Sequence, residues 1–149
     1  RFTFLSAVTL PRGVVDLAEM KRIVFARFAA PAVTGGAPVI LDARPTERFR
    51  GEVEPIDPRP GHIPTTKSAP TAGNLDASGR FLPSEALRAR FAALGVTRGE
   101  DVICSCGSGV TACHNLIALE LAGLPGARLY AGSYSEWANQ PELPVERGG

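Results

Sequence analysis

The residues best suited to chemistry in this sequence are three cysteines close together in the chain, Cys104, Cys106 and Cys113. Cys106 opens a glycine-rich stretch, 106–109, that follows a short apolar run and precedes a helical pattern. Two glycines allow a tight loop with inward-facing backbone N–H groups, and the helix start adds unpaired N–H groups and the positive end of its dipole. Such a site binds anions and should stabilise a thiolate, the nucleophilic form of cysteine. The pattern therefore predicts a reactive Cys106, against the alternative of an inert buried cysteine.

Other loops with this strand–loop–helix plan fit the residues less well. A Walker loop ends in Gly-Lys-Ser/Thr, which is absent here. A tyrosine-phosphatase-type loop needs an arginine six residues after the cysteine, where Ala112 stands, so phosphate chemistry is disfavoured. Cys104, Cys106, Cys113 and His114 do not follow a familiar zinc spacing, and we expect no metal. Cys104 is expected in the core, and Cys113 is expected to pack against the sheet.

The elements that must position this loop alternate along the chain. Short apolar runs predict buried strands at 39–41, 102–104 and 129–130, and helical spacing predicts helices at 15–28, 84–94, 110–122 and 135–137. A turn is expected at 33–38, and the stretch 51–80, rich in Pro, Gly and Thr, is expected to be irregular and functional. This order predicts an α/β fold with a mostly parallel central sheet flanked by helices on both faces. Ligands bind beyond the carboxyl ends of such strands, where Asp42 and Cys106 both fall.

Composition narrows the class of protein. The chain of 149 residues suits one domain, and 16 basic against 15 acidic residues give no excess charge for binding nucleic acid. Apolar runs are too short to span a bilayer, and no signal-peptide pattern opens the chain, so no membrane partner is expected. An odd number of clustered cysteines favours a reducing cytoplasm over a disulfide framework. Because the first residue is Arg1, we expect either a removed N-terminus or a piece of a longer protein.

Several motifs resemble one known family. The stretch from Cys106 to Cys113 resembles the active-site loop of the 3-mercaptopyruvate sulfurtransferases, which belong to the rhodanese superfamily. Further segments resemble the family in the right order, namely Asp42-Ala-Arg44, Arg48-Phe-Arg-Gly51, Gly61-His-Ile-Pro64, Gly132-Ser-Tyr-Ser-Glu-Trp137 and Leu143-Pro-Val145. The resemblance implies that residues 1–149 form a single rhodanese-like catalytic domain, the C-terminal half of a tandem enzyme whose N-terminal rhodanese-like domain is a partner.

The resemblance also implies a mechanism. Cys106 would take sulfur from 3-mercaptopyruvate or thiosulfate as a persulfide and pass it to cyanide, a small thiol or a thioredoxin-like protein, with no metal or organic cofactor. Arg48 and Arg59 would hold the carboxylate of the donor. The loop residues that would bind the transferred sulfur are Gly107, Ser108, Gly109, Val110 and Thr111. Gly107 and Ser108 stand where thiosulfate-specific members carry basic residues, which favours mercaptopyruvate.

A second function stays open, a non-enzymatic rhodanese-like module that senses or carries sulfur. Two positions depart from the family pattern, Thr65 in place of Gly and Ser68 in place of Asn, and both predict a locally altered turn. His62 is expected to be a structural turn residue. The remaining expectations are that Tyr134 and Trp137 pack under the C-terminal segment and that Arg44 and Arg50 pair with acids on a solvated loop.

Overall fold

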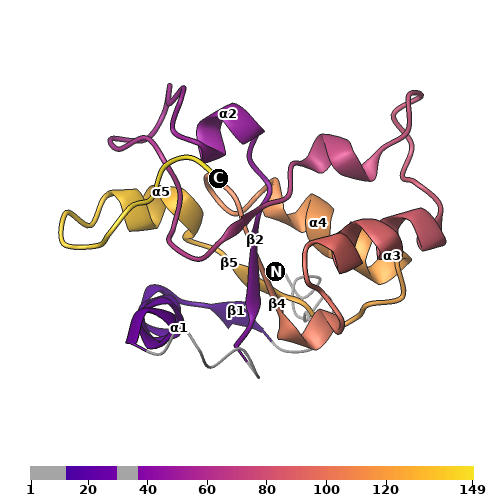
Figure 1. Ribbon diagram of the computed structural model, residues 1–149, viewed down its shortest axis with the longest axis horizontal. Coiled ribbons are helices and arrows are strands. Elements are labelled where there is room, and N and C mark those ends of the chain that lie inside the picture. The colour runs from indigo at the N-terminus through magenta and orange to yellow at the C-terminus, as the bar shows by residue number, and fades with distance from the viewer. Residues whose placement is uncertain (1–12, 30–36) are drawn as a thin grey trace, which may run out of the picture.

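The computed structural model describes residues 13–29 and 37–149, and its centre is a five-stranded sheet in the order β1-β5-β4-β2-β3 (Figure 1). Every strand pair runs parallel, which confirms the predicted parallel sheet. The strands are β1 (Val14–Val15), β2 (Val39–Asp42), β3 (Lys67–Ser68), β4 (Val102–Ser105) and β5 (Arg128–Tyr130).

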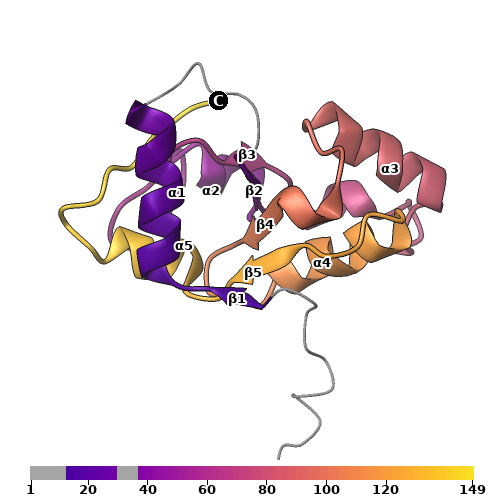
Figure 2. The same ribbon diagram turned by 90° about the horizontal axis from the view of Figure 1, so that it is seen from below.

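Helices cover both faces of the sheet, as predicted. Figure 2 shows α1 and α5 on one face and α3 and α4 on the other. The helices are α1 (Leu17–Ala29), α2 (Thr46–Phe49), α3 (Ser84–Ala93), α4 (Ala112–Leu121) and α5 (Ser133–Ala138), with 3-10 turns η1 (Thr71–Asn74) and η2 (Gly99–Asp101). The layers are those of an α/β fold with the ligand side at the carboxyl ends of the strands.

Alternation along the central strands divides the core into two clusters. Ile40 and Ile103 face the cluster that contains α1 and α5 residues, whereas Leu41 and Cys104 face the cluster that contains α3 and α4 residues. Successive strand residues point to opposite faces, so a strand covered on both sides must be apolar throughout. This explains why the runs at 39–41 and 102–104 show no polar alternation.

The predicted helix at 15–28 begins two residues later than expected. Val14–Val15 forms β1 instead, paired in register with Leu129 and Tyr130. Asp16 caps the start of α1, because the Glu19 amide donates to Asp16 Oδ1 at 2.8 Å. The predicted turn at 33–38 lies mostly outside the described residues.

The stretch 51–80 contains two short elements, β3 and η1, that the local sequence does not predict. β3 forms because Lys67 pairs with Leu41 of β2, and the Ala69 amide then donates to the Asp42 carbonyl at 2.8 Å. Just before it, Thr65 adopts a φ of 69°, in the left-handed region that favours glycine. Thr65 therefore adopts a backbone conformation typical of glycine, whereas its replacement of the family's Gly predicted a locally altered turn.

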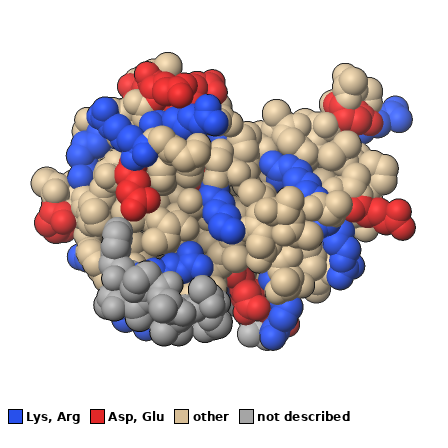
Figure 3. Space-filling model, in the orientation of Figure 1, with Lys and Arg blue, Asp and Glu red and all other residues tan. Residues whose placement is uncertain are grey.

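Charge is spread in small groups of both signs on the face that Figure 3 shows. That face carries no continuous basic surface of the kind that nucleic-acid binding requires. Within residues 13–29 and 37–149, no helix combines the length and the apolar character needed to cross a membrane.

Candidate active site

Cys106 lies at the carboxyl end of β4, in the loop that leads into α4. The residue is 1% exposed, and the Gly109 amide donates to its Sγ at 3.1 Å. Gly109 has a φ of 85°, and a Cβ there would lie 2.5 Å from the Ala131 carbonyl oxygen. The tight loop predicted from the glycines therefore exists, and close approach to the backbone after β5 requires the second of them.

The start of α5 holds the loop from behind. The Cys106 amide donates to Ser133 Oγ at 3.0 Å. In return, the Tyr134 amide donates to the Cys106 carbonyl and the Ser135 amide donates to the Gly107 carbonyl, both at 2.9 Å. These bonds turn the carbonyl groups of the loop away from the sulfur. The sequence reasoning missed this role of Ser133, although the residue lies in the segment 132–137 that resembles the family.

The loop amides that follow remain available for an anion. Within the described part of the chain, the amides of Gly107, Ser108, Val110 and Thr111 donate to no protein acceptor. α4 begins at Ala112, so the positive end of its dipole lies at the same place. We call these four amides and the Gly109 amide the amide cradle. The arrangement can stabilise negative charge on Cys106 or on a sulfur attached to it.

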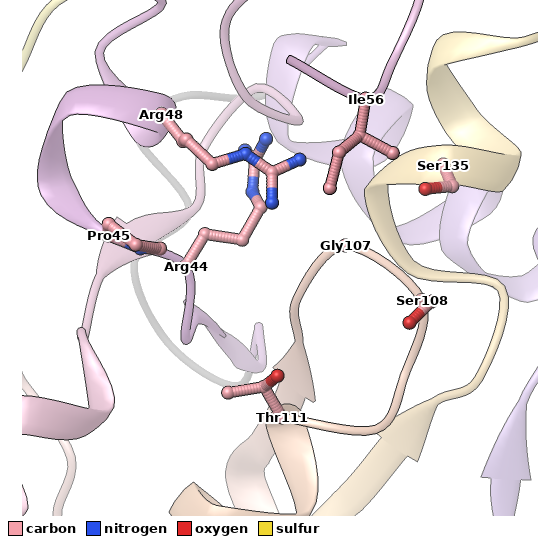
Figure 4. Close-up of a pocket in the computed structure, with 8 residues that line it drawn as sticks. All are labelled: Arg44, Pro45, Arg48, Ile56, Gly107, Ser108, Thr111 and Ser135. Carbon is pink, nitrogen blue, oxygen red and sulfur yellow. The ribbon is translucent and has the colours of Figure 1, made fainter. Parts of the chain in front are cut away.

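A pocket of about 210 Å³ opens above the amide cradle (Figure 4). Its lining residues come from the loop after β2, the cysteine loop and α5, and are Arg44, Pro45, Arg48, Ile56, Gly107, Ser108, Thr111 and Ser135. This volume is below the range typical of drug-sized ligands, so the pocket suits a molecule of only a few heavy atoms.

Arg48 reaches over the loop, as Figure 4 shows. A Cβ on Gly107 would lie 3.7 Å from Arg48 Nη1, so the guanidinium faces the amide cradle directly. Nη2 of Arg48 donates to Glu54 at 2.8 Å and to Asp57 at 3.1 Å. The structure thus brings together Cys106, its loop and Arg48, although a bound donor at Arg48 stays a prediction. The two carboxylates escaped the sequence reasoning, which had only their three-residue spacing in a proline-rich loop as a signal.

Arg59, in contrast, does not line this pocket, and its contact with the substrate stays a prediction. Its guanidinium donates to four backbone carbonyls at the end of the chain, those of Trp137, Ala138, Gln140 and Leu143, at 2.7 to 3.2 Å. Four of its five N–H groups are therefore occupied. Arg59 anchors the segment after α5 and has little capacity left for a carboxylate.

Arg44 pairs with acids as predicted, but the prediction that it lies on a solvated loop is wrong. The residue is 2% exposed, its Nη2 lies 2.7 Å from Asp42 Oδ2, and its guanidinium carbon lies 4.0 Å from the centre of the Tyr134 ring. The prediction fails because the C-terminal helix covers this loop. Arg50 is about half exposed and donates to the Gly149 carbonyl.

The other two cysteines differ from each other. Cys104 is fully buried, as expected, and burial raises the pKa of its thiol, so it stays neutral. Cys113 is exposed on α4, so the prediction that it packs against the sheet is wrong. Partial burial and the neighbouring Cys106 raise the pKa of Cys113, and its Sγ lies 3.5 Å from the Gly109 carbonyl oxygen. Helix phase puts residue 113 on the outer side, whereas Ala112 and Leu116 meet the sheet side.

Three aromatic residues have the structural roles expected of them. His62 is 5% exposed, stacks on Phe49 with ring centres 3.8 Å apart, and bonds through Nδ1 to the Phe49 carbonyl. Tyr134 donates its hydroxyl to the Arg59 carbonyl, and Trp137 donates Nε1 to the Pro144 carbonyl. All three are buried beneath the loop and the C-terminal segment, so none lines the pocket.

Comparison with protein-family models matches residues 27–140 to the rhodanese-like domain. The chain belongs to the rhodanese family. It is 58% identical over 112 residues to a probable 3-mercaptopyruvate sulfurtransferase of Pseudomonas aeruginosa, covering 73% of this chain and 39% of that protein. It is 38% identical over 145 residues to the 3-mercaptopyruvate sulfurtransferase of Escherichia coli, covering 94% and 50%.

Two further rhodanese relatives carry other descriptions. The chain is 32% identical over 124 residues to the sulfur carrier protein TtuD of Thermus thermophilus, and the match covers 78% of this chain and 44% of that protein. The crystal structure of the Tum1 protein of Saccharomyces cerevisiae is 34% identical with a TM-score of 0.73, matching 92% of this chain and 47% of that one. The chain thus spans half or less of the length of these rhodanese relatives.

Proposed function

We propose that this rhodanese domain is a sulfurtransferase that moves sulfur from 3-mercaptopyruvate, in preference to thiosulfate, through a persulfide on Cys106. The observation that carries the proposal is the buried Cys106 sulfur within the amide cradle, below a small pocket that Arg48 enters. Close relatives described as 3-mercaptopyruvate sulfurtransferases support the same donor.

The first half-reaction follows from this geometry. The Cys106 thiolate attacks the donor sulfur, an S–S bond forms, and the C–S bond of mercaptopyruvate breaks. Its electron pair passes to the carbon, which takes up a proton to give pyruvate. Amides of the cradle stabilise the negative charge on the outer sulfur, and Arg48 holds the donor carboxylate. The other loop contacts would come from Gly107, Ser108 and Thr111, which line the pocket.

In the second half-reaction an acceptor thiolate or cyanide attacks the outer sulfur and releases the Cys106 thiolate. We propose a small thiol or a thioredoxin-like protein as the acceptor and a cytoplasmic location, which the three free cysteines support. We also propose that residues 1–149 act as a single catalytic domain beside an N-terminal rhodanese-like domain. The length of the relatives supports such a companion domain.

Intact mass measurement tests the chemistry. After incubation with mercaptopyruvate the protein should gain one sulfur that cyanide then removes, and Cys106→Ser should gain none. Arg48→Ala should lower kcat/KM for mercaptopyruvate by roughly ten- to a hundredfold, as expected for a lost hydrogen-bonded ion pair. In the same variant, the rate at which a thiol without a carboxylate removes sulfur from the preformed persulfide should hardly change. Equal slowing of both half-reactions would refute the carboxylate role.

A non-enzymatic sulfur carrier is the second candidate, favoured by the likeness to TtuD. A carrier would accept sulfur from a persulfidated partner protein and would turn over mercaptopyruvate and thiosulfate poorly. Loading of Cys106 from a protein persulfide, with no loading from either small donor, would favour this second candidate over the enzyme.

A further inference from the structure

The arginine that faces the sulfur loop is itself held by two buried carboxylates. Nη2 of Arg48 donates to Glu54 Oε1 at 2.8 Å and to Asp57 Oδ2 at 3.1 Å. Both carboxylate side chains are 3% exposed, whereas the Arg48 side chain is 15% exposed. One nitrogen therefore serves both carboxylates, while Nη1 makes no hydrogen bond within the described residues and both nitrogens lie close to Gly107 of the cysteine loop.

The carboxylates are fixed by contacts of their own. Oε1 of Glu54 accepts the amides of Ile56 and Asp57, each at 3.1 Å, and Oε2 accepts Arg44 Nη1 at 3.3 Å. Oδ1 of Asp57 accepts the Ser135 hydroxyl at 2.6 Å. Burial opposes ionisation of Glu54, but the two amide hydrogen bonds and the Arg48 guanidinium outweigh it and lower the pKa of Glu54. Rigid, ionised partners thus determine where the Arg48 guanidinium points.

The connected network carries no surplus positive charge. It joins three carboxylates, Asp42, Glu54 and Asp57, to two guanidinium groups, Arg44 and Arg48, and so holds one negative charge in excess. The carboxylate of a sulfur donor that binds Arg48 therefore meets N–H groups with a fixed direction, but the carboxylates of the network already balance their positive charge. A singly charged carboxylate needs only such directed hydrogen bonds, whereas a dianion loses more hydration and finds no extra positive charge in return.

We infer that Glu54 and Asp57 are positioning residues that aim Arg48 at the pocket and neutralise it, so that the site selects a singly charged carboxylate donor over a dianion such as thiosulfate. This inference rests on the proposed sulfur-transfer function and assigns its donor selectivity to two residues that need not touch the donor. The same roles explain why two carboxylates are buried beside a pocket that binds anions, although their negative charge opposes anion binding.

The test compares both donors in Asp57→Asn. The amide keeps the size of the side chain, and its oxygen can still accept the Ser135 hydroxyl, but one negative charge and the acceptor for Arg48 Nη2 are lost. We expect kcat/KM for thiosulfate relative to mercaptopyruvate to rise on the order of tenfold, mainly through a lower KM for thiosulfate, because a charge this close is only partly screened. Added salt should reduce that gain.

Matched controls separate selectivity from stability. Glu52→Gln removes a carboxylate that is 59% exposed on the same loop, and it should leave the donor ratio unchanged. Glu54→Gln should shift the ratio in the same direction as Asp57→Asn, and it serves as the second variant if Asp57→Asn folds poorly, with melting temperatures recorded for both. An equal loss of activity toward both donors, or an unchanged ratio, would overturn the inference. Failure of the unmodified protein to form persulfide from either donor would overturn the proposed function, and the inference with it.

Discussion

The two glycines of the cysteine loop should respond very differently to alanine. Gly109 has a φ of 85°, and its added Cβ would lie 2.5 Å from the Ala131 carbonyl oxygen and 3.2 and 3.3 Å from the Ala131 C and Cα atoms. These are backbone atoms, so the neighbour cannot rotate away. A left-handed alanine costs about 1–2 kcal/mol, and overpacking adds about 1–3 kcal/mol. Restricting the unfolded chain returns about 0.4–1 kcal/mol.

Gly109→Ala should therefore lower the free energy of unfolding by about 2–4 kcal/mol, the difference between these terms. It should also displace the amide that donates to Cys106 Sγ at 3.1 Å. Loss of one preorganised donor lowers turnover by about a hundredfold or more in comparable sites. Urea unfolding measures the first effect, and the rate of persulfide formation from mercaptopyruvate measures the second.

Gly107→Ala is the matched control. No positive φ is needed there, and the nearest atoms to its Cβ would be Arg48 Nη1 at 3.7 Å and Nη2 at 3.8 Å, which is ordinary contact. Stability should change by less than about 0.5 kcal/mol, as for substitutions without a steric conflict, while KM for the donor rises because the methyl group enters the pocket. If the two variants lost stability equally, the argument from the close approach of Gly109 to Ala131 would be refuted.

Three further experiments test the structural assignments. Thr65→Gly should raise the free energy of unfolding by about 0.5–1 kcal/mol in urea titrations. It removes left-handed strain and a buried hydroxyl that has no partner among the described residues, and these gains exceed the extra backbone entropy of glycine. A loss of stability would contradict that strain. Arg59→Ala should lower the free energy of unfolding by roughly 2–4 kcal/mol, because four carbonyls lose their partner, and should leave the donor ratio unchanged. A selective loss of mercaptopyruvate use would instead support the predicted substrate role. Peptide mapping after alkylation at neutral pH should find Cys113 modified and Cys104 protected until the protein unfolds. Because Cys113 also reacts, the reactivity of Cys106 must be measured in Cys113→Ser. Labelling of Cys104 in the folded protein would contradict its burial.

Local patterns predicted most of the fold because the longer elements contain their own signals. The helical spacing around Leu87 and Phe91 and the apolar run of β4 each identify an element without reference to the rest of the chain. The two-residue strands β1 and β3 escaped prediction, since each exists only through pairing with a neighbour distant in sequence. The start of α1 was shifted for the same reason, because Val14–Val15 belongs to the sheet.

The same distinction separates the two arginines predicted for the donor. Arg48 lies only six residues after Asp42, on the short helix that follows β2, so topology alone brings it to the edge where Cys106 lies. Arg59 lies in an irregular loop, and its partners come from residues about eighty positions away. No local pattern predicts which backbone carbonyls a long flexible cation will meet.

The sequence by itself predicted the amide cradle, because a cysteine and two glycines ahead of a helix start favour a tight loop with free N–H groups. Tertiary structure decided which charges surround that loop. Packing of α5 over the loop after β2 buried Arg44 beside Tyr134 and brought Ser135 to Asp57. Burial strengthens such interactions and demands partners for every charge, and it depends on segments that meet only in the folded chain.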